Sequence, residues 1–446
     1  MFSTLLSAVR QLRGKVARNF GQTFKSMKDP NFRNYSLGMF VSSCGTWMQS
    51  VALSWLVYRL TGSAAALGIV SFANSLPLLL LTFVGGMAAD RFSKRKILLI
   101  TNSIAMLQAL LLTFLVWSGH ATIGLVIALS VLLGIVTAFE VPTRQSLVPM
   151  LIKDEKDIHN AIGLSSATFH VSRMVGPALA GLAIARFGEL ICFALNTVSF
   201  VAALVAVWLV QVRDHAQDKT TTANSAAPGK ATETSFWQVF RNPGIMTLII
   251  LAAFFSTFGM QYSLLMPVIV DKILHGQSEQ FGFMSAAGGL GSLIGALVIA
   301  SLGERKGLRR RLGLAAVVLS LSIVLLAYSK FFPLSVLAIM ICGASLSMHW
   351  SGGNSLMQQC AEPGKRGRLM GIYTTFTLGM APFTALLAGW SAEHLGVVNA
   401  LLVAAGGMFC GACLYLYKSR KLDDTCNGYG TGSKTGSKNG TGNGGA

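Results

Sequence analysis

The sequence predicts an all-α polytopic membrane protein, with twelve transmembrane helices arranged as two pseudo-symmetric six-helix bundles. Three observations support this fold class: the composition, the spacing of the apolar runs and a repeat that relates the two halves of the chain. Of the 446 residues, 52% are hydrophobic and only 12% are charged, whereas roughly 25% are charged in a typical soluble domain. The charged residues lie in short clusters between long apolar runs, as expected for a membrane protein.

Twelve apolar runs are long enough to cross a membrane. A hydrocarbon core about 30 Å thick needs about 20 residues of helix. Lipid supplies no hydrogen-bond partners, so a span must satisfy its backbone groups internally, and runs of this length do so as helices. The runs cover residues 36–58, 66–88, 97–117, 122–141, 160–185, 190–210, 245–270, 281–302, 312–329, 332–352, 368–390 and 396–417.

The distribution of basic residues predicts the orientation. A net charge of +19 would indicate nucleic-acid binding in a soluble protein, but here nearly all Lys and Arg fall in loops on one side. The exceptions are Arg59, Arg186, Lys272, Lys330 and Arg173, the last of which lies within a span. Cytoplasmic loops carry the excess of basic residues, so both termini are predicted to be cytoplasmic and no nucleic-acid partner is expected.

Composition divides the chain into five segments. Residues 1–33 form a basic, amphipathic segment that is predicted to lie on the cytoplasmic face of the membrane. Residues 213–242 are polar and are predicted to be a cytoplasmic linker, and residues 419–446 are predicted to be a disordered Gly/Ser/Thr-rich tail. Between these segments lie the predicted N-terminal bundle, residues 34–212, and the predicted C-terminal bundle, residues 243–418.

Short matching motifs indicate that the second half duplicates the first. Gln145-Ser146-Leu147 matches Asn354-Ser355-Leu356, and Ala180-Gly181 matches Ala388-Gly389 at nearly the same separation. Matched elements at a near-constant offset are typical of a parallel repeat, and the linker falls where such a duplication requires one.

The loop between the second and third runs carries the most specific local motif, Gly86-Met87-Ala88-Ala89-Asp90-Arg91-Phe92-Ser93-Lys94-Arg95. Gly86 would let a neighbouring helix approach closely. The Asp90 carboxylate would interact with the positive N-terminal end of another helix, and Lys94 or Arg95 would pair with Glu140 at the end of the fourth run. We interpret these residues, with Arg91, as a gating lock; an ordinary positive-inside loop would explain the basic residues but not the aspartate or the glycine.

This loop resembles the signature loop of the major facilitator superfamily, with Ser93 where that family usually has glycine. Three further segments, Pro142–Pro149, Arg173–Gly181 and Arg366–Met370, resemble the enterobactin-exporter and macrolide-efflux branch, the transmembrane secretion effectors. The resemblance covers the chain from about residue 30 to residue 418. It implies twelve spans, alternating access and, in many members, outward transport coupled to protons.

The fifth run contains an arginine deep within the membrane. Arg173 would be costly against lipid and should face protein or a water-filled cavity. It shares one helical stripe with Ser166 and His170, and His170 could carry protons, although a packed neutral histidine is the alternative. Arg173 either contacts an anionic or acceptor-rich substrate or pairs within the bundle. Gly176-Pro177 and Gly181 resemble the helix bend of superfamily antiporters.

The resemblance also implies that the first, fourth, seventh and tenth runs line a central cavity, whose few polar groups would suit an amphipathic organic molecule. The candidate residues on this pathway are Trp47, Gln49, Gln261 and Tyr262, besides those of the fifth run. His349 occupies the repeat-equivalent position of Glu140. Together with Arg366 and Arg368 it is predicted to form a gate in the second half, and a hydrogen-bonded interfacial histidine is the alternative.

These features predict a secondary active transporter that exports a siderophore or drug-like molecule, coupled to protons, across the bacterial cytoplasmic (inner) membrane. An importer or a lysophospholipid flippase on the same scaffold is the alternative. An enzyme is disfavoured because no metal-ligand cluster, nucleophile elbow or phosphate-binding loop occurs, and a sensor because no further folded domain is attached. The expected partners are the small molecule, protons and the lipid bilayer, and an outer-membrane efflux partner is compatible with export. No cofactor and no metal are expected.

Overall fold

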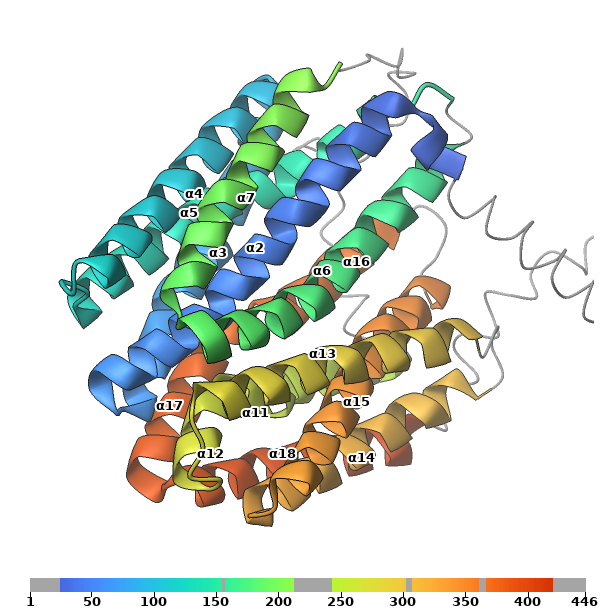
Figure 1. Ribbon diagram of the computed structural model, residues 1–446. Coiled ribbons are helices and arrows are strands. Elements are labelled where there is room, and N and C mark those ends of the chain that lie inside the picture. Colours follow the sequence, from blue (N-terminus) through green and yellow to red (C-terminus); the bar gives the residue numbers. More distant parts are fainter. Residues whose placement is uncertain (1–24, 155–156, 212–242, 302–306, 361–365, 420–446) are drawn as a thin grey trace, which may run out of the picture.

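The computed structural model describes residues 25–154, 157–211, 243–301, 307–360 and 366–419, and within these ranges the regular structure is helical, without β-strands (Figure 1). The first part of the chain forms α2 (Pro30–Thr61), α3 (Ala64–Arg91), α4 (Lys94–Trp117), α5 (Ile123–Leu147), α6 (Ile158–Phe187) and α7 (Leu190–Leu209). The second part forms α10 (Pro243–Phe254), α11 (Gln261–Leu264), α12 (Met266–Lys272), α13 (Ser278–Ser301), α14 (Leu308–Tyr328), α15 (Phe332–Gln359), α16 (Arg366–Leu378), α17 (Ala381–Leu395) and α18 (Val397–Ser419). Two short 3-10 helices, η1 (Lys25–Lys28) and η2 (Val148–Leu151), and a π-helical segment, η4 (Phe255–Gly259), complete the set.

Three of the predicted segments fall wholly or largely outside the described residues. They are the basic N-terminal segment up to residue 24, the linker 213–242 and the tail beyond Ser419. Of the N-terminal segment, η1 packs against the start of α6. The Ser26 hydroxyl donates to Asn160 Oδ1 at 2.7 Å, and Lys25 forms an ion pair with Asp157 at 2.6 Å.

Ten helical segments of the described chain are long and apolar enough to cross a membrane, so the protein is an integral membrane protein. Each of the twelve predicted runs is helical over most of its length. The two that are not among the ten, 36–58 and 160–185, lie in α2 and α6. Both helices carry more polar side chains than their neighbours, and these side chains belong to the candidate site described below.

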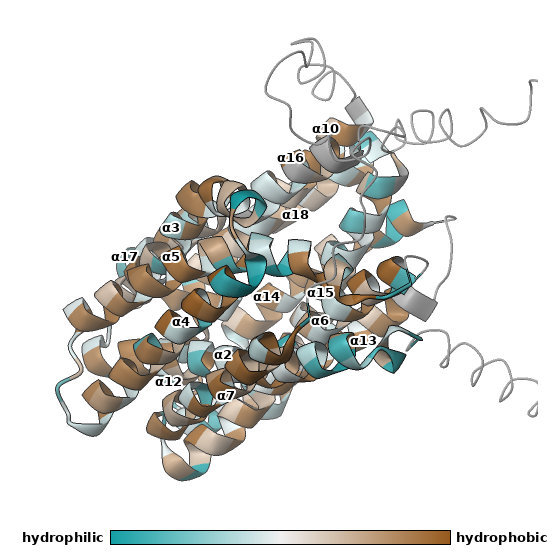
Figure 2. Cartoon of the chain, turned by 90° about the horizontal axis from the view of Figure 1, so that it is seen from above, coloured by the Kyte–Doolittle hydropathy of each residue, from teal (hydrophilic) through white to brown (hydrophobic). Residues whose placement is uncertain are grey.

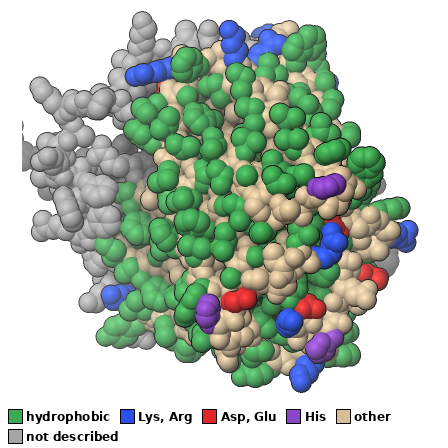
Figure 3. All heavy atoms as spheres, turned by 90° about the vertical axis from the view of Figure 1, so that its left-hand side faces the viewer, with side chains coloured by type: hydrophobic (Ala, Val, Ile, Leu, Met, Phe, Trp, Pro, Cys, Tyr) green, Lys and Arg blue, Asp and Glu red, His purple; other side chains and the backbone are tan. Residues whose placement is uncertain are grey.

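The outer surface of the described chain is apolar over a wide area (Figures 2 and 3). Large side chains such as Leu80, Phe83, Trp208 and Leu297 are well exposed, and 76% of the Phe83 surface is accessible. In Figure 3 the hydrophobic side chains cover the middle of the face, and the charged ones gather toward its edges. A continuous apolar surface of this extent is costly in water and is suited to contact with lipid.

Local sequence fixes the sharp turn between α2 and α3. Gly62 ends α2 with φ of 62°, a left-handed conformation that glycine adopts without steric cost. Ser63 then caps α3, and its hydroxyl accepts a hydrogen bond from the Ala66 amide at 3.2 Å. The two helices are therefore antiparallel neighbours joined by two residues.

Two of the predicted runs are broken rather than continuous. The seventh run consists of α10, η4, α11 and α12, and Pro267, which has no amide hydrogen to donate, stands at the start of α12. The eleventh run is divided between α16 and α17 at Gly379, with Pro382 in the first turn of α17. Proline and glycine at these positions weaken the hydrogen bonding of the helix backbone. A prediction based on the number of consecutive apolar residues does not detect such breaks.

The helices before residue 210 pack mainly against one another, as do those after residue 243, and we call these the first and second groups (Figure 1). The groups meet along two seams, where α6 packs against α13 and α3 packs against α17. Backbones touch at both seams: a Cβ added to Gly181 would lie 2.5 Å from the Gly282 backbone, and one added to Gly68 would lie 2.5 Å from the Ala385 carbonyl oxygen. Glycine allows this close approach.

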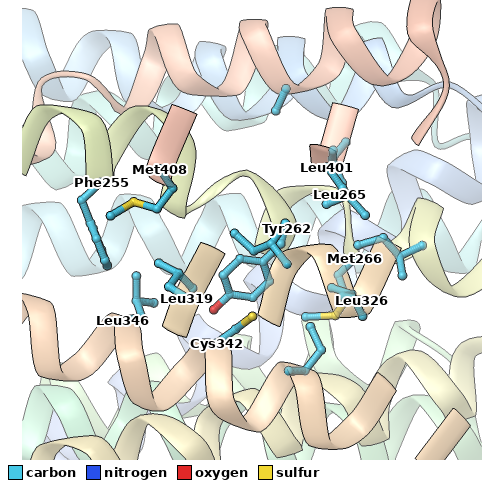
Figure 4. Packing of buried hydrophobic residues seen from close by; sticks show 14 of the residues in the cluster. Phe255, Tyr262, Leu265, Met266, Leu319, Leu326, Cys342, Leu346, Leu401 and Met408 are labelled. Carbon is cyan, nitrogen blue, oxygen red and sulfur yellow. The ribbon is translucent and has the colours of Figure 1, made fainter. Parts of the chain in front are cut away.

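The two ends of the molecule differ in charge. Arg91, Lys94 and Arg144 lie at the end where α3 and α5 terminate, which we call the basic end. Tyr58 and Glu393 lie at the opposite end, where α2 and α17 terminate. Between the ends, the second group has an apolar core (Figure 4) that includes Phe255, Leu265, Leu319, Leu401 and Met408.

Candidate substrate site and gates

The predicted gating loop is a tight connection at the basic end. Only Phe92 and Ser93 separate α3 from α4. Asp90 and Arg91 are exposed, and Asp90 makes no hydrogen bond or ion pair with any described residue. The predicted contact of Asp90 with the N-terminus of another helix is therefore not found among the described residues.

The glycine that permits close helix packing is Gly85, not Gly86. A Cβ on Gly86 would meet no atom within 4 Å, whereas a Cβ on Gly85 would lie 2.9 Å from the Ala138 carbonyl carbon of α5. The role predicted for Gly86 is wrong by one position. The motif marks a loop by its sequence, but which of two adjacent glycines faces α5 depends on the rotation of α3 about its own axis.

The predicted pairing of Lys94 or Arg95 with Glu140 is also wrong for this structure. Glu140 pairs instead with Arg144, one turn further along α5, at 3.4 Å. Arg95 donates to the Trp208 carbonyl oxygen at the end of α7. The nearer i, i+4 arginine satisfies the carboxylate, and the free carbonyls at the α7 C-terminus attract the Arg95 guanidinium.

Arg173 lies on an aromatic surface formed by α2 and α6. Its guanidinium carbon is 5.3 Å from the centroid of the Trp47 ring. Trp47 in turn contacts Phe169 edge-to-face, with ring centroids 5.9 Å apart. The Arg144 guanidinium carbon is 6.0 Å from the Phe169 centroid. The result is a row of two cations and two aromatic rings contributed by α2, α5 and α6.

The predicted polar stripe on α6 consists of Ser166, His170 and Arg173, of which Ser166 and Arg173 have described side chains. Ser166 is exposed, and its hydroxyl donates to the Ile162 carbonyl oxygen of its own helix at 3.0 Å. The side chain of His170 lies outside the described residues. Sequence analysis did not single out Phe169 or Arg144, although their spacing of four residues from Arg173 and Glu140 respectively could have indicated both.

The predicted bend residues of α6 act as packing positions. The helix is continuous from Ile158 to Phe187, with Pro177 inside it. A Cβ on Gly176 would lie 2.5 Å from the Trp47 Cβ, so Gly176 brings α6 close to α2 and positions Trp47 near Arg173. Gly181 allows the close approach of α6 to α13 at the seam between the two groups.

In this structure Gln49 is the centre of a buried polar network. It is 2% exposed. Its amide nitrogen donates to Gln108 Oε1 at 3.0 Å, and Asn196 Nδ2 donates to Gln49 Oε1 at 2.8 Å. Ser199 donates to the Asn196 carbonyl oxygen at 2.8 Å. The network joins α2, α4 and α7, and the role of Gln49 in a substrate pathway stays a prediction.

Gln261 and Tyr262 are buried within the second group rather than exposed to a cavity. Gln261 Nε2 donates to the Thr257 carbonyl oxygen at 2.9 Å, and its Oε1 has no partner among the described residues. Tyr262 is 3% exposed, and its hydroxyl points toward Cys342 (Figure 4).

Of the predicted second-half gate, only the side chain of His349 belongs to the described residues. His349 is 1% exposed and stacks on Phe255 with ring centroids 3.7 Å apart. Neither ring nitrogen has a partner among the described residues. Arg366 and Arg368 begin α16, and their side chains lie outside the described residues.

The opposite end holds contacts between the groups that sequence analysis did not identify. One Glu393 carboxylate oxygen, on α17, accepts hydrogen bonds from the Ser63 hydroxyl at 3.0 Å and from the Ala64 and Ala65 amides at 2.9 and 3.2 Å. This places a negative charge at the positive N-terminus of α3. The Tyr58 hydroxyl of α2 donates to Asp271 Oδ2 of α12 at 2.6 Å.

The described residues contain no group of three or more His, Cys, Asp or Glu side chains placed to hold a metal ion. The described row of Arg173, Trp47, Phe169 and Arg144 combines cations with aromatic rings, a set that can bind and orient an organic molecule.

Known proteins similar to this chain are transporters. The chain is 27% identical to the staphyloferrin A transporter of Staphylococcus aureus over 86% of its own length and 95% of the relative. It is 26% identical to the multidrug efflux pump Tap of Mycobacterium tuberculosis, covering 83% and 89%, and 23% identical to macrolide efflux protein A of Streptococcus pyogenes, covering 86% and 96%.

Solved structures share the fold. The nucleoside transporter NupG matches with a TM-score of 0.66 at 14% identity, covering 87% of this chain and 99% of the other. A bacterial homologue of the human lysosomal transporter Spinster, in an inward-facing and unoccupied conformation, matches with a TM-score of 0.65 at 15% identity, covering 89% and 97%. The sequence profile of transmembrane secretion effectors matches residues 22–427, which confirms the resemblance seen in the sequence motifs. The chain belongs to the transmembrane secretion effector family of the major facilitator superfamily.

Proposed function

We propose that this protein is a proton-coupled exporter of a small organic molecule, a siderophore or a drug-like compound. It works by alternating access between an N-terminal six-helix bundle, residues 34–212, and a C-terminal six-helix bundle, residues 243–418. The protein resides in a bacterial inner membrane with both termini and the basic end in the cytoplasm, as the distribution of basic residues favours.

The main support for alternating access is an asymmetry between the two ends of the molecule. Among the described residues, every hydrogen bond between the first and second groups lies at the opposite end, where Glu393 caps α3 and Tyr58 bonds Asp271. At the basic end, Asp90 is exposed and has no partner among the described residues of the second group. We interpret this arrangement as a state that is closed toward the outside and open toward the cytoplasm.

The gating loop completes the cycle in this proposal. When the bundles close at the basic end, Asp90 would gain the helix N-terminus that it lacks here, while the contacts of Glu393 and Asp271 separate. A carboxylate at each end would then stabilise one of two conformations, and the balance between them would set the direction in which the site is open. Protons are carried by an acidic or histidine side chain, with Glu140, His170 and Asp271 as the candidates.

The relatives support small-molecule export as the class of function. Two of the three relatives named above are efflux proteins, and the third transports a siderophore. The chain itself carries no GxxxxGK[ST] segment, so an ion gradient rather than nucleotide hydrolysis is the energy source we propose.

The proposal can be tested in inside-out membrane vesicles that contain the full-length protein. After a pH gradient is imposed, uptake of labelled erythromycin or staphyloferrin A is followed with and without a protonophore, and vesicles without the protein serve as the control. We expect protein-dependent uptake of at least one compound and its loss when the gradient collapses. Unchanged uptake with the protonophore would remove proton coupling. Accumulation only in right-side-out vesicles would reverse the direction.

A further inference from the structure

Arg173 is a cation within a predicted span, and no anionic partner for it occurs among the described residues. The described ion pairs involve Lys25, Arg59, Arg144 and Lys272, and not Arg173. The guanidinium has five N–H donors and remains charged. The face of the Trp47 ring interacts with the charge of the Arg173 guanidinium. The ring has no oxygen or nitrogen acceptor for the N–H donors of the guanidinium.

The nearby arginine, Arg144, provides a comparison within the same row of side chains. Arg144 has a carboxylate partner, Glu140, at 3.4 Å. Arg173, on α6, lies over the Trp47 ring of α2, and no described carboxylate pairs with it. An anion that enters from the basic end would therefore meet one arginine that is already neutralised and a second that is not.

The surroundings of Arg173 also indicate the shape of a ligand. Phe169, one helical turn from Arg173, is 39% exposed, and its ring meets Trp47 at an interplanar angle of 65°. Two rings in this edge-to-face arrangement offer a flat apolar body the same contacts that aromatic pairs make in protein cores. Exposed Ser166 and Thr46 flank this surface on α6 and α2 and can supply hydrogen bonds.

We propose that Arg173, with Trp47 and Phe169, is the binding site for an aromatic or flat amphipathic molecule that carries a carboxylate. The carboxylate pairs with the planar guanidinium fork of Arg173, and the body of the molecule packs on the two rings. The inference rests on the proposed transport function. It adds that the transported molecules are organic anions, which the proposed function alone does not specify.

Three probes of matched shape test the charge selection: 2-naphthoate, neutral 2-naphthamide and cationic 2-naphthylmethylammonium. Binding is measured by titration calorimetry to the full chain in nanodiscs, with empty nanodiscs as the blank. We expect 2-naphthoate to bind about tenfold more tightly than 2-naphthamide, the size of effect expected for a charge-assisted pair, and the ammonium to bind most weakly.

Substitutions then test whether Arg173 and Trp47 cause the preference for the acid over the amide. Arg173→Gln should weaken 2-naphthoate binding about tenfold and leave 2-naphthamide unchanged, and Arg173→Lys should fall between because it keeps the charge but loses the fork. Trp47→Leu should weaken both probes. The matched control is Arg186→Gln, because Arg186 is an exposed arginine at the far end of the same helix. Equal affinity for the acid and the amide, no binding of any probe, or full naphthoate binding by Arg173→Gln would overturn the site.

Counterflow of the same probes in proteoliposomes separates this inference from the proposed function. Transport without preference for the acid would overturn the anion site and leave the exporter intact. Selective binding through Arg173 without any transport would support the site but contradict the proposed function.

Discussion

At the scale of single residues, burial separates the polar side chains that hold the fold from those available to a ligand. Gln49 and Trp47 are two positions apart on α2, yet Gln49 faces Gln108 and Asn196 inside the first group, and Trp47 faces Arg173. A period of 3.6 residues per turn sends such positions to opposite sides of a helix. Their contributions are therefore expected to be separable by mutation.

Gln49→Leu should destabilise the protein without a direct effect on the ligand site. It leaves the Gln108 carbonyl and the Asn196 amide unpaired in a buried environment, at a cost of about 1–3 kcal/mol. We expect a lower apparent melting temperature for the purified protein in detergent. Ser50→Ala, at the exposed neighbouring position of α2, should leave it unchanged. An unaltered melting temperature for Gln49→Leu would show that the network is not required for stability.

At the scale of elements, the ends of α3 are the places where the two groups of helices interact or separate. The N-terminus of α3 accepts Glu393 as a cap from α17, at a seam where Gly68 brings the backbones into contact. The C-terminal turn of α3 carries Asp90, which has no partner among the described residues. One rigid helix thus presents a satisfied contact at one end and an available carboxylate at the other.

Glu393→Gln and Asp90→Asn should shift the conformational equilibrium in opposite directions. Removing the Glu393 charge weakens the hydrogen bonds to the Ala64 and Ala65 amides. Hydrogen exchange of a peptide that spans residues 62–68 should therefore become several-fold faster. Asp90→Asn should slow the same exchange and reduce transport, because it weakens the conformation that competes with this one.

The control for this pair is Glu279→Gln, which removes an exposed carboxylate from the first turn of α13. Its exchange should match the unmodified protein. Faster exchange in all three variants would indicate general loosening of the fold, and it would contradict an equilibrium between two closed ends.

At the scale of the whole molecule, the wide apolar surface suits contact with lipid (Figure 3). Burial of this surface favours insertion into a bilayer, and the proposed orientation follows from the preference of basic loops for the cytoplasmic side. The orientation can be tested independently of transport.

Tags inserted at residues 225 and 440 should be accessible only from the cytoplasm, and tags at 119 and 275 only from outside. Side-specific proteolysis or labelling of intact cells and inside-out vesicles measures this. Untagged protein and a cytoplasmic marker protein control for leakage. Access to 225 and 275 from the same side would contradict both the number of spans and the orientation.

The sequence by itself determined the membrane class, the helical segments and the family. These depend on properties that run along one stretch of chain: enough apolar residues to cross the bilayer, backbone groups that must be satisfied within the segment, and motifs such as the loop that ends at Arg95. None of them depends on which residue faces which neighbour. The predicted helices therefore agree with the described ones except where Pro267 and Gly379 interrupt them.

Only the tertiary structure decided the contacts between distant helices. Three basic residues, Lys94, Arg95 and Arg144, were candidates to pair with Glu140. The ion pair forms with Arg144 because it lies one turn away on the same helix. Gly85 rather than Gly86 faces α5, and Glu393 meets Ala64 across hundreds of residues of sequence. The rotation and crossing of packed helices set each of these pairings. The polarity of a residue indicates that it needs a hydrogen-bond or ion-pair partner. The packing of the helices determines which residue that partner is.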